Sequence, residues 1–336
     1  MHTPLPGLLL LATGGTIAGE AASPDRTQAY TPAAVPVERL LDAVPGIRQR
    51  AQVRAEQPYA IGSQHLASSH WLTLAARICA AQSDPAIDGM VITHGTDTME
   101  ETAFFLDLVC ARTKPLVLTG AMRPSTALGA DGPMNLYAAA SVALDRRCAQ
   151  AGPLIVMNDQ IFAPDQACKA HTSRTDAFIA REGAPIGVMA DGLPHWRHNP
   201  GGLAQTRPSL ATQFHNLPTH LPRVDILAQQ VDVDVEIVDW MLTRGARGIV
   251  VAGTGHGSIA DPLQAALRRA ATSGCIVVRA SRVAAGPVHR GASVDDDAQG
   301  FIAAGFLPPH KARLLTSLAL AAGLQREAIQ ALFARY

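Results

Sequence analysis

The feature that most constrains the fold is a series of short apolar runs, each bounded by glycine or proline. The runs are rich in Val, Ile and Leu and lack polar alternation, as in strands that a parallel sheet buries on both faces. They cover residues 8–12, 90–93, 116–119, 154–157, 249–252 and 276–278. Helical stretches lie between them, at residues 71–81, 100–111, 135–149, 235–244 and 262–272. This alternation predicts an α/β fold of the doubly wound type, with mostly parallel sheets.

One segment interrupts the alternation. Residues 195–222 contain four prolines and the pair Gly201-Gly202 with little apolar periodicity, which is typical of an extended linker. We therefore expect a larger amino-terminal domain at residues 1–194 and a smaller carboxy-terminal domain at residues 223–336, both doubly wound. The length of 336 residues agrees with two domains of roughly 150 residues each.

The charge balance and the amino terminus exclude several classes of partner. Lys plus Arg total 28 and Asp plus Glu total 28, so the formal net charge is zero, and no basic run argues for a nucleic-acid partner. The amino-terminal apolar run is too short to cross a membrane and has no basic segment before it, so we expect neither a membrane partner nor an export signal. This predicts a cytoplasmic protein. The alternative is a periplasmic one whose export signal was trimmed.

The five cysteines are odd in number and scattered, at positions 79, 110, 148, 168 and 275. No Cys-x-x-Cys motif and no Cys/His pairing has the spacing of a zinc site. We therefore expect no disulfide framework and no metal.

Polar residues capable of chemistry gather just after the predicted strands. Thr13-Gly-Gly-Thr16 follows the first strand and His94-Gly-Thr-Asp-Thr98 follows the second. Further clusters lie at residues 120–125, 158–159, 253–258 and 279–282. Ligands of open α/β sheets bind outside the carboxyl ends of the strands. The sequence therefore predicts a ligand site at that edge of the sheet.

Individual residues of these clusters allow more than one interpretation. Thr16 leaves a strand on a glycine-rich turn and is a candidate nucleophile, although such glycines often serve only the turn. His94 is a candidate general base or a histidine that satisfies nearby backbone groups. Asp97 is a candidate anchor for a cationic group, because a buried carboxylate needs a paired charge, or a cap for the helix that opens near Glu100. Lys169 is interpreted as surface charge unless a partner is present.

Several motifs together resemble the bacterial L-asparaginases, a homotetrameric amidohydrolase family that includes the mixed glutaminase-asparaginases. Two signatures are highly specific at their separation: Ala-Thr-Gly-Gly-Thr-Ile-Ala-Gly and Val-Ile-Thr-His-Gly-Thr-Asp-Thr-Met-Glu-Glu. The resemblance runs nearly from end to end of the chain. Its motifs lie at residues 12–19, 61–64, 91–101, 120–125, 131–133, 156–159 and 294–296.

The resemblance implies a set of catalytic residues. Thr16 would be the primary nucleophile on the side-chain amide carbon, with Tyr30 on the flexible loop after it shielding and polarising the hydroxyl. Thr96, Lys169 and Asp97 would form a second cluster, in which a lysine held neutral or sharing its proton helps Thr96 relay a proton or activate the deacylating water. An acyl-enzyme would form at Thr16 with loss of ammonia and would then be hydrolysed to aspartate. No metal and no organic cofactor is implied.

The resemblance also implies the substrate contacts. Ser63 would bind the α-carboxylate, while Asp97 and Gln64 would hold the α-ammonium group. Thr96 and Ala121 also belong to the substrate-binding set, and the backbone N–H groups of Thr16 and the Thr96 region would meet the oxyanion. In this family the carboxy-terminal domain of a neighbouring subunit completes each site. An intimate dimer within a tetramer is therefore expected.

Two departures from the family pattern lie on that neighbour-supplied wall. Ser258 stands where many relatives place an asparagine, a replacement also seen in relatives with substantial glutaminase activity. Ser293 stands where relatives usually carry a glutamate that approaches the substrate ammonium, and losing that carboxylate predicts weaker anchoring of the amino group. The preference between glutamine and asparagine stays open, because one methylene is worth only about 1–3 kcal/mol in discrimination.

These residues favour an L-asparagine amidohydrolase with a threonine nucleophile and with glutamine as a lesser substrate. A non-catalytic amino-acid-binding protein on the same fold is the alternative, because a fold does not imply a function. Both threonines, Lys169, Asp97 and Tyr30 are retained, whereas a binding module needs no activated nucleophile. A relative that processes charged transfer RNA is disfavoured by the neutral net charge.

Overall fold

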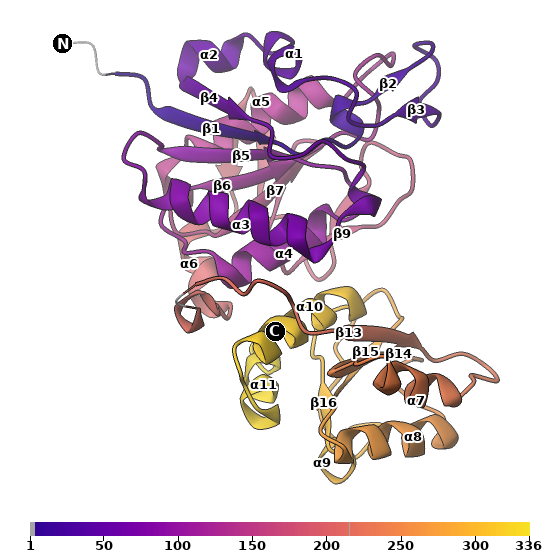
Figure 1. Cartoon of the computed structure of the whole chain (residues 1–336). Helices are drawn as coiled ribbons and strands as arrows, with labels where there is room; N and C mark the ends of the chain where they lie inside the picture. The colour runs from indigo at the N-terminus through magenta and orange to yellow at the C-terminus, as the bar shows by residue number, and fades with distance from the viewer. Residues whose placement is uncertain (1–3, 215) are drawn as a thin grey trace. The chain divides into compact units, whose positions relative to one another are not determined.

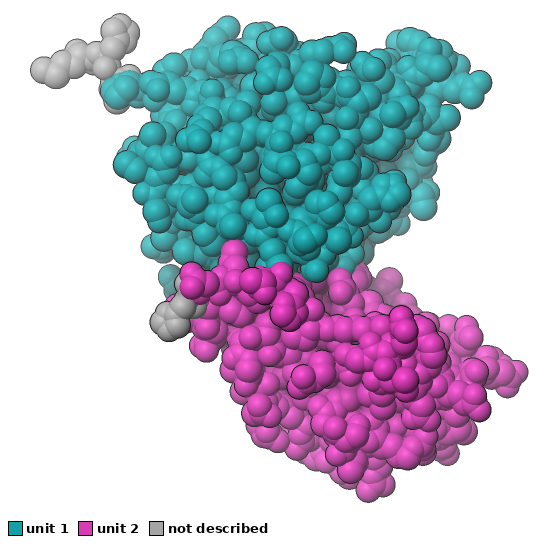
Figure 2. Space-filling view, viewed as in Figure 1, with its two compact units in different colours: residues 1–206 teal, residues 207–336 magenta. Residues whose placement is uncertain are grey.

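The computed structural model describes residues 4–214 and 216–336. Within them the chain forms two compact units, which divide between Thr206 and Arg207 (Figure 1). Figure 2 shows unit 1 in teal and unit 2 in magenta. The division lies inside the segment 195–222.

The segment 195–222 is not extended throughout, contrary to its proline and glycine content. It holds the end of strand β12 (Leu193–Trp196), helix α6 (Pro200–Thr206) and a short 3-10 helix, η4 (Ala211–Gln213). Pro200 begins α6, a position where the missing N–H of proline costs no helical hydrogen bond. A proline at the start of a helix is therefore easily mistaken for a sign of linker.

Unit 1 contains an eight-stranded sheet among its described residues. Five neighbouring strands are parallel: β4 (Gln52–Glu56), β1 (Gly7–Ala12), β5 (Gly89–Thr93), β6 (Leu116–Thr119) and β7 (Pro153–Met157). Three more strands continue the sheet in antiparallel fashion: β8 (Gln160–Phe162), β11 (Gly187–Ala190) and β12. The parallel strands place their carboxyl ends along one edge, which is where the polar clusters follow them.

Two tight hairpin turns explain the antiparallel part of the sheet. Asn158 and Asp159 join β7 to β8 with φ values of 49° and 58°. Asp191 and Gly192 join β11 to β12 with φ values of 51° and 73°. Two central residues with positive φ form the hairpin turn whose twist matches that of the strands. The polar pair at 158–159, grouped above with the candidate site clusters, therefore reverses the chain.

Helices cover both faces of the unit 1 sheet. Leu8 and Leu10 of β1 belong to a core shared with helices α1 (Val37–Asp42), α2 (Gly46–Arg50) and α5 (Gly132–Ala143). The alternate residues Leu9 and Leu11 are equally buried on the opposite face, which α3 (Ser68–Ser83) and α4 (Met99–Val109) cover (Figure 1). A central strand buried on both sides has no need of polar alternation, which accounts for the apolar runs.

Two small hairpins project from this framework. Strands β2 (Glu20–Ala21) and β3 (Tyr30–Thr31) pair in antiparallel fashion and carry Tyr30. Strands β9 (Ala167–Lys169) and β10 (Phe178–Ala180) do the same and carry Lys169. Both hairpins therefore deliver a predicted site residue from outside the main sheet.

Among its described residues, unit 2 contains a four-stranded parallel sheet. Its strands in order are β13 (Val224–Ala228), β14 (Gly248–Gly253), β15 (Ile276–Ser281) and β16 (Phe301–Ala303). Helices α7 (Glu236–Thr243) and α8 (Asp261–Thr272) share one core with the sheet, and α10 (Pro309–Ala321) packs against β13 to β15. Helices α9 (Asp296–Gln299) and α11 (Arg326–Phe333) contact β16.

The two mostly parallel α/β sheets confirm the predicted fold class. One predicted helix was too long: residues 135–149 divide into α5 and a short 3-10 helix, η3 (Arg146–Cys148). The carboxylate of Asp145 accepts a hydrogen bond from the backbone N–H of Arg147 and so begins this second helix. In the described part of the chain, no helix has the length and apolar character needed to cross a bilayer.

Candidate active site

Two glycine-containing turns meet at the carboxyl ends of the neighbouring strands β1 and β5. Gly15, in the turn after β1, has a φ of 79°, and a Cβ atom there would lie 2.3 Å from the Cα of Gly95. A Cβ on Gly95 would in turn lie 2.6 Å from the hydroxyl of Ser63. Because only glycine permits these approaches, the two turns pack backbone against backbone and bring Thr16, Thr96 and Ser63 together.

A cavity of about 210 Å³ opens between these turns. This is below the ~300–1,000 Å³ of sites for drug-sized ligands and suits a smaller metabolite. It is lined by Gly15, Thr16, Gln28, Tyr30, Pro32, Gly62, Ser63, Gln64, Gly95, Thr96 and Asp97. Six of the predicted site residues are in this lining. Ala121 is not, because its methyl group is buried in the hydrophobic core.

Thr16 begins the 3-10 helix η1 (Thr16–Ala18) directly after the glycine turn. Its side chain is buried, and its Oγ1 lies 2.6 Å from the hydroxyl oxygen of Tyr30. Either hydroxyl can donate this short hydrogen bond. The backbone N–H groups of Thr16 and Thr96 donate to no acceptor among the described residues. Such groups at the start of a helix or turn are available to an anionic oxygen.

Thr96, Lys169 and Asp97 form the second cluster that the sequence predicted. The Lys169 ammonium donates to Thr96 Oγ1 at 2.8 Å and to Asp97 Oδ1 at 2.6 Å. The backbone N–H of Lys169 donates to the buried Glu100 carboxylate at 3.1 Å, which fixes β9 against the first turn of α4. Lys169 is therefore held by Thr96 and Asp97 and is not an isolated surface charge.

Asp97 differs from its expected setting in two ways. Its side chain is 59% exposed, so the argument that a buried carboxylate needs a paired charge does not apply to it. It also does not cap the following helix, because Thr98 occupies the position before α4. The Thr98 hydroxyl instead donates to the Ser63 carbonyl at 3.1 Å and ties the two walls of the cavity together.

Ser63 lies in the 3-10 helix η2 (Ser63–His65), at the cavity floor. Its hydroxyl is buried, yet it has no hydrogen-bond partner within the described chain. A buried polar atom without a partner is costly, so a ligand that supplies one is stabilised. Gln64, its neighbour, is exposed and lines the same cavity.

His94 was a candidate general base or a partner for nearby backbone groups, and its contacts match the second role. Its Nδ1 lies 2.7 Å from the Gly95 carbonyl, and its Nε2 lies 2.9 Å from the Thr102 hydroxyl. Thr102 in turn accepts a hydrogen bond from the indole N–H of Trp71 at 2.8 Å. Burial lowers the pKa of His94 to about 4, against a raising effect of the Gly95 carbonyl. A neutral imidazole with both nitrogens engaged holds the Gly95 turn in place.

The hairpin that carries Tyr30 is held by a segment that sequence reasoning missed. Ser125 donates its N–H and its hydroxyl to the Gly19 carbonyl, at 3.0 and 2.8 Å. The Ala21 N–H donates to the Thr126 hydroxyl at 2.9 Å, and the Leu128 N–H donates to the Pro24 carbonyl at 2.8 Å. We call the hairpin of β2 and β3 the lid, and we call residues 125–128, which hold it through these hydrogen bonds, the lid clamp.

Other contributors were missed for want of any local signal. Gln28 and Pro32 line the cavity from the lid. Ser125 was noticed only as part of a polar cluster after a strand, and nothing near it in sequence indicates contact with Gly19, which lies 106 positions away. Glu100 was seen only as the start of a helix.

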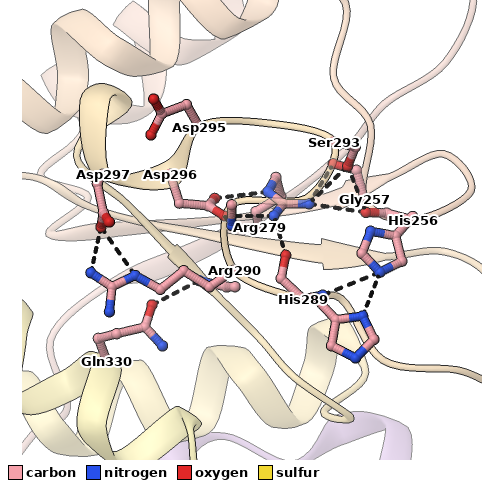
Figure 3. A network of polar contacts seen from close by, with 12 residues as sticks. His256, Gly257, Arg279, His289, Arg290, Ser293, Asp295, Asp296, Asp297 and Gln330 are labelled. Atoms are coloured by element: carbon pink, nitrogen blue, oxygen red, sulfur yellow. Dashed lines mark hydrogen bonds and ion pairs between the residues drawn. The ribbon is translucent and has the colours of Figure 1, made fainter.

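Ser258 and Ser293 lie in unit 2, and Ser293 lies beside the buried side chain of Arg279 (Figure 3). Arg279 forms a two-pronged ion pair with Asp296, at 2.8 and 2.6 Å. It also donates to the carbonyls of His256 and His289 and, at 3.3 Å, to the Ser293 hydroxyl. The Ser293 hydroxyl in turn donates a hydrogen bond to the His256 carbonyl at 3.1 Å.

Ser258 is exposed at the end of a tight loop after β14. Its backbone N–H and carbonyl both pair with Thr254, at 2.7 and 3.1 Å. The loop is therefore fixed by its own backbone and by Arg279. Arg279 was seen in the sequence only as part of a polar cluster after a strand, and its role as the organiser of this surface was not predicted.

Nothing in the described chain gathers three or more His, Cys, Asp or Glu side chains in an arrangement that could hold a metal ion. The side chains of the cavity offer hydroxyl, amide and carboxylate groups, and the Lys169 ammonium contacts Thr96 and Asp97 from outside the lining.

Two family models match the chain. The model described as Asparaginase, N-terminal, matches residues 7–201, and the model described as Glutaminase/Asparaginase C-terminal domain matches residues 223–333. The chain belongs to the asparaginase family. The cavity with both threonines falls in the first matched region of this asparaginase-family chain, and Ser258 and Ser293 fall in the second.

Individual relatives resemble this asparaginase-family chain over almost its full length. It is 41% identical to the L-asparaginase 2 of Escherichia coli K12, over 99% of this chain and 94% of that one. It is 39% identical to the glutaminase-asparaginase of Acinetobacter glutaminasificans, over 98% and 99%. It is also 39% identical to a probable periplasmic L-asparaginase of Haemophilus influenzae, over 98% and 93%.

A solved structure confirms the likeness in three dimensions. The crystal structure of a probable cytoplasmic L-asparaginase from Campylobacter jejuni matches with a TM-score of 0.90 at 38% identity. The match covers 98% of this chain and 100% of that one. The resemblance read from the motifs is thereby confirmed at the level of family and fold.

Proposed function

We propose that this protein hydrolyses L-asparagine to L-aspartate and ammonia, with L-glutamine as a lesser substrate. The observation that carries the proposal is the pair of hydroxyls in one cavity: Thr16 Oγ1 lies 2.6 Å from Tyr30, and Thr96 Oγ1 lies 2.8 Å from the Lys169 ammonium. Relatives named L-asparaginase and glutaminase-asparaginase match nearly the whole chain. A site that only bound an amino acid would need no such pair.

The lining of the cavity supports a definite orientation of the substrate. The unpartnered Ser63 hydroxyl would donate to the α-carboxylate. The Asp97 carboxylate, which faces the cavity, and the Gln64 amide would accept from the α-ammonium group. Ala121 would contribute only its main chain, because its side chain is fully buried. The side-chain amide then points toward Thr16 and Thr96.

The first half of the proposed reaction forms an ester. Thr16 Oγ1 attacks the amide carbon, and the Thr16 and Thr96 N–H groups stabilise the developing oxyanion. The contact with Tyr30 polarises the Thr16 hydroxyl. The C–N bond then breaks, the Thr16 proton ends on the departing nitrogen, and ammonia leaves the acyl-enzyme.

The second half hydrolyses that ester. Thr96 would orient the incoming water and relay its proton to the amine of Lys169, which takes part in this step in its neutral form, while the water attacks the same carbonyl carbon. The ester C–O bond breaks, Thr16 regains a proton, and aspartate is released. The Lys169–Asp97 contact keeps the lysine aimed at Thr96. Every step uses residues that line the cavity, Lys169 next to it, or water.

The assembly is part of the same proposal. Ser258 and Ser293 would face the cavity of a neighbouring subunit, in a homotetramer built from two intimate dimers. The exposed positions of both serines leave them free for such a contact. Light scattering and sedimentation of the purified protein test the tetramer.

For location, we propose the cytoplasm, on the likeness to the Campylobacter jejuni protein titled as probable cytoplasmic. The periplasm is the alternative, since one relative is named as periplasmic. Fractionation of the source cells, with the protein followed by antibody, decides between them.

The activity is tested by ammonia release from L-asparagine and L-glutamine over a series of concentrations. We expect turnover of asparagine that Thr16→Ala abolishes and Thr16→Ser partly retains, with the melting temperatures of both variants close to that of the wild type. If the intact protein turns over neither amide but asparagine raises its melting temperature, the amidohydrolase is wrong and the amino-acid-binding protein is supported.

A further inference from the structure

Helices α3 and α4 lie side by side (Figure 1). Each begins a few residues after a residue that lines the cavity, Gln64 for α3 and Asp97 for α4. At the cavity end, the Trp71 ring stacks on the Phe105 ring with centroids 5.5 Å apart. At the far end, Cys79 of α3 meets Cys110, the residue that ends α4. Each cysteine lies roughly 16 Å along its helix from the first helical residue, at 1.5 Å per residue.

The two cysteines form a close pair of unequal exposure. Their Sγ atoms lie 3.8 Å apart, which is S–H···S hydrogen-bond distance. Cys79 is half-buried and Cys110 is buried, and neither is in a disulfide. Cys110 directly follows the last residue of α4 and has extended backbone angles. Its Sγ also lies 4.0 Å from the Ala75 carbonyl of α3. The sulfur atoms are thus close enough to bond after a small movement of either side chain.

The setting distinguishes an attacking thiol from a resolving one. The hydrogen bond from Cys110 lowers the pKa of Cys79 to about 7, against the effect of burial. The same hydrogen bond and burial raise the pKa of Cys110. By contrast, burial raises the pKa of Cys275 to about 11 and raises that of Cys148 as well. Because thiolates attack disulfides and exposed ones are reached first, Cys79 is the reactive member of the pair.

We propose that Cys79 and Cys110 form a reversible dithiol–disulfide site that exchanges with small-molecule disulfides such as oxidised glutathione. The Cys79 thiolate attacks one sulfur of oxidised glutathione, which releases one glutathione thiolate and leaves a mixed disulfide on Cys79. Cys110 loses its proton, attacks the Cys79 sulfur and releases the second glutathione thiolate. The two protein thiols lose two electrons in total, and one glutathione disulfide gains them.

The disulfide would fasten the far ends of two helices whose near ends carry the site. Ser63 precedes α3 and Asp97 precedes α4, and the cross-link closes a loop, residues 79–110, that contains Asp97 but not Ser63. Cross-linking residues 79 and 110 restricts the unfolded chain and stabilises the folded one. The cavity lies at the opposite end of both helices, so its geometry is unchanged.

The test uses the full-length protein incubated with oxidised glutathione at neutral pH. Free thiols are then blocked with N-ethylmaleimide, the protein is unfolded, and it is digested with trypsin without reduction. Residues 78–112 form a single tryptic peptide, which contains Cys79 and Cys110 and no other cysteine. We expect this peptide to lose two hydrogen masses and to take up no blocking groups. Dithiothreitol should restore two reactive thiols.

Two variants test the order of the steps. Cys110→Ser should retain one glutathionyl group on Cys79, because the resolving thiol is gone. Cys79→Ser should take up little glutathione, because Cys110 is buried. Cys168→Ser, which changes another half-buried cysteine of unit 1, should form the 79–110 disulfide as the wild type does.

A second readout is thermal stability. The oxidised wild type should melt on the order of 5–10 °C above the reduced one, and Cys168→Ser should show the same shift while Cys79→Ser shows none. The KM for asparagine should change less than about twofold, since the pair lies far from the cavity. A glutathione adduct on wild-type Cys79 that does not resolve, a peptide that stays fully reduced, or equal melting temperatures of the two forms would each overturn the proposal.

Discussion

At the scale of single residues, buried His94 links the candidate site to the pH dependence of folding. Its pKa is lowered to about 4 by burial, whereas the unfolded chain takes up this proton near the ordinary value of 6.5. The unfolded state therefore binds more protons between these values. The stability that depends on neutral His94 is complete above pH 6.5. It falls as the pH drops toward 4, by about 3 kcal/mol in total.

Urea unfolding at a series of pH values checks this expectation. His94→Gln should be less stable than the wild type at neutral pH, and its free energy of unfolding should fall less steeply between pH 6.5 and pH 4. Thr102→Val is the matched control: it removes the hydroxyl partner of Nε2 and should cost about 1–3 kcal/mol, yet it keeps the wild-type slope. Equal slopes for His94→Gln and the wild type would contradict the assignment.

Ser293 stands at a position where the resemblance leads us to expect a glutamate. Ser293→Glu should lower the KM for asparagine by up to about fivefold, which corresponds to the ~1 kcal/mol that an exposed ion pair contributes. The added carboxylate would attract the substrate ammonium in the proposed neighbouring cavity. Ser293→Gln controls for size and for the lost hydrogen bonds to Arg279 and the His256 carbonyl. Steady-state kinetics that are the same for the two variants would rule out a role for the charge.

The residues that sequence reasoning could place are those that lie directly after a strand. Thr16 and Thr96 meet because β1 and β5 are neighbours in a parallel sheet, so the residues after both strands lie at the same edge. Asp296 shows the limit. It is the middle residue of the acidic run Asp295–Asp297, in which Asp295 caps α9, whereas Asp296 is fully buried against Arg279. The burial of a charge depends on a partner from another strand, which no local pattern reveals.

At the scale of elements, the lid depends on the lid clamp at residues 125–128. Thr126→Val keeps the shape of the side chain but removes the acceptor for the Ala21 N–H, which is worth about 0.5–1.5 kcal/mol. We expect the lid to open roughly two- to tenfold more often. Trypsin should then cut faster after Arg26, which is exposed within the lid, because cleavage follows the population of the open form.

Two comparisons isolate this effect. Thr126→Ser retains a hydroxyl and should restore slow cleavage. Thr272→Val removes a hydroxyl that only donates within its own helix in unit 2, and it should cut like the wild type. Unchanged cleavage in Thr126→Val would show that the lid does not need this hydrogen bond. Cleavage requires no turnover, so the result stands apart from the proposed activity.

The central parallel strands were found as uniform apolar runs, whereas the short antiparallel strands β8 and β11 and several edge strands were not. The edge strands β4 and β13 contain Arg54, Glu56 and Asp225, which the edge position leaves partly exposed. Polar residues are tolerated there because one side of the strand has no neighbour. The lid hairpin, with only two residues per strand, has no periodicity to detect.

At the scale of the whole molecule, complementation can test the proposal that unit 2 of one subunit completes the cavity of a neighbouring subunit. A Thr16→Ala chain lacks the nucleophile but has a normal unit 2. A Ser258→Trp chain has the nucleophile but should block the cavity of its neighbour. Each variant alone should be nearly inactive. Refolded together in equal amounts, they should recover about a quarter of wild-type activity, because a quarter of the sites then combine two intact parts.

The matched control is the double variant with both changes in one chain, mixed with the Thr16→Ala chain. This mixture contains no intact nucleophile and should stay inactive. Absence of recovery in the first mixture, with tetramers present by light scattering, would mean that each chain completes its own site.

The position of β1 also sets a requirement on how the protein is made. This strand, Gly-Leu-Leu-Leu-Leu-Ala, precedes both of its partners, β4 and β5, along the chain. The β5 residues leave the ribosome roughly 80 residues later, a delay of about 4–16 s at ~5–20 residues per second. Until β4 emerges, neither edge of this apolar strand has its partner, and the edge that pairs with β5 stays open for the whole interval. The yield of folded protein therefore depends on what shields these few leucines while the rest of the sheet is still being translated.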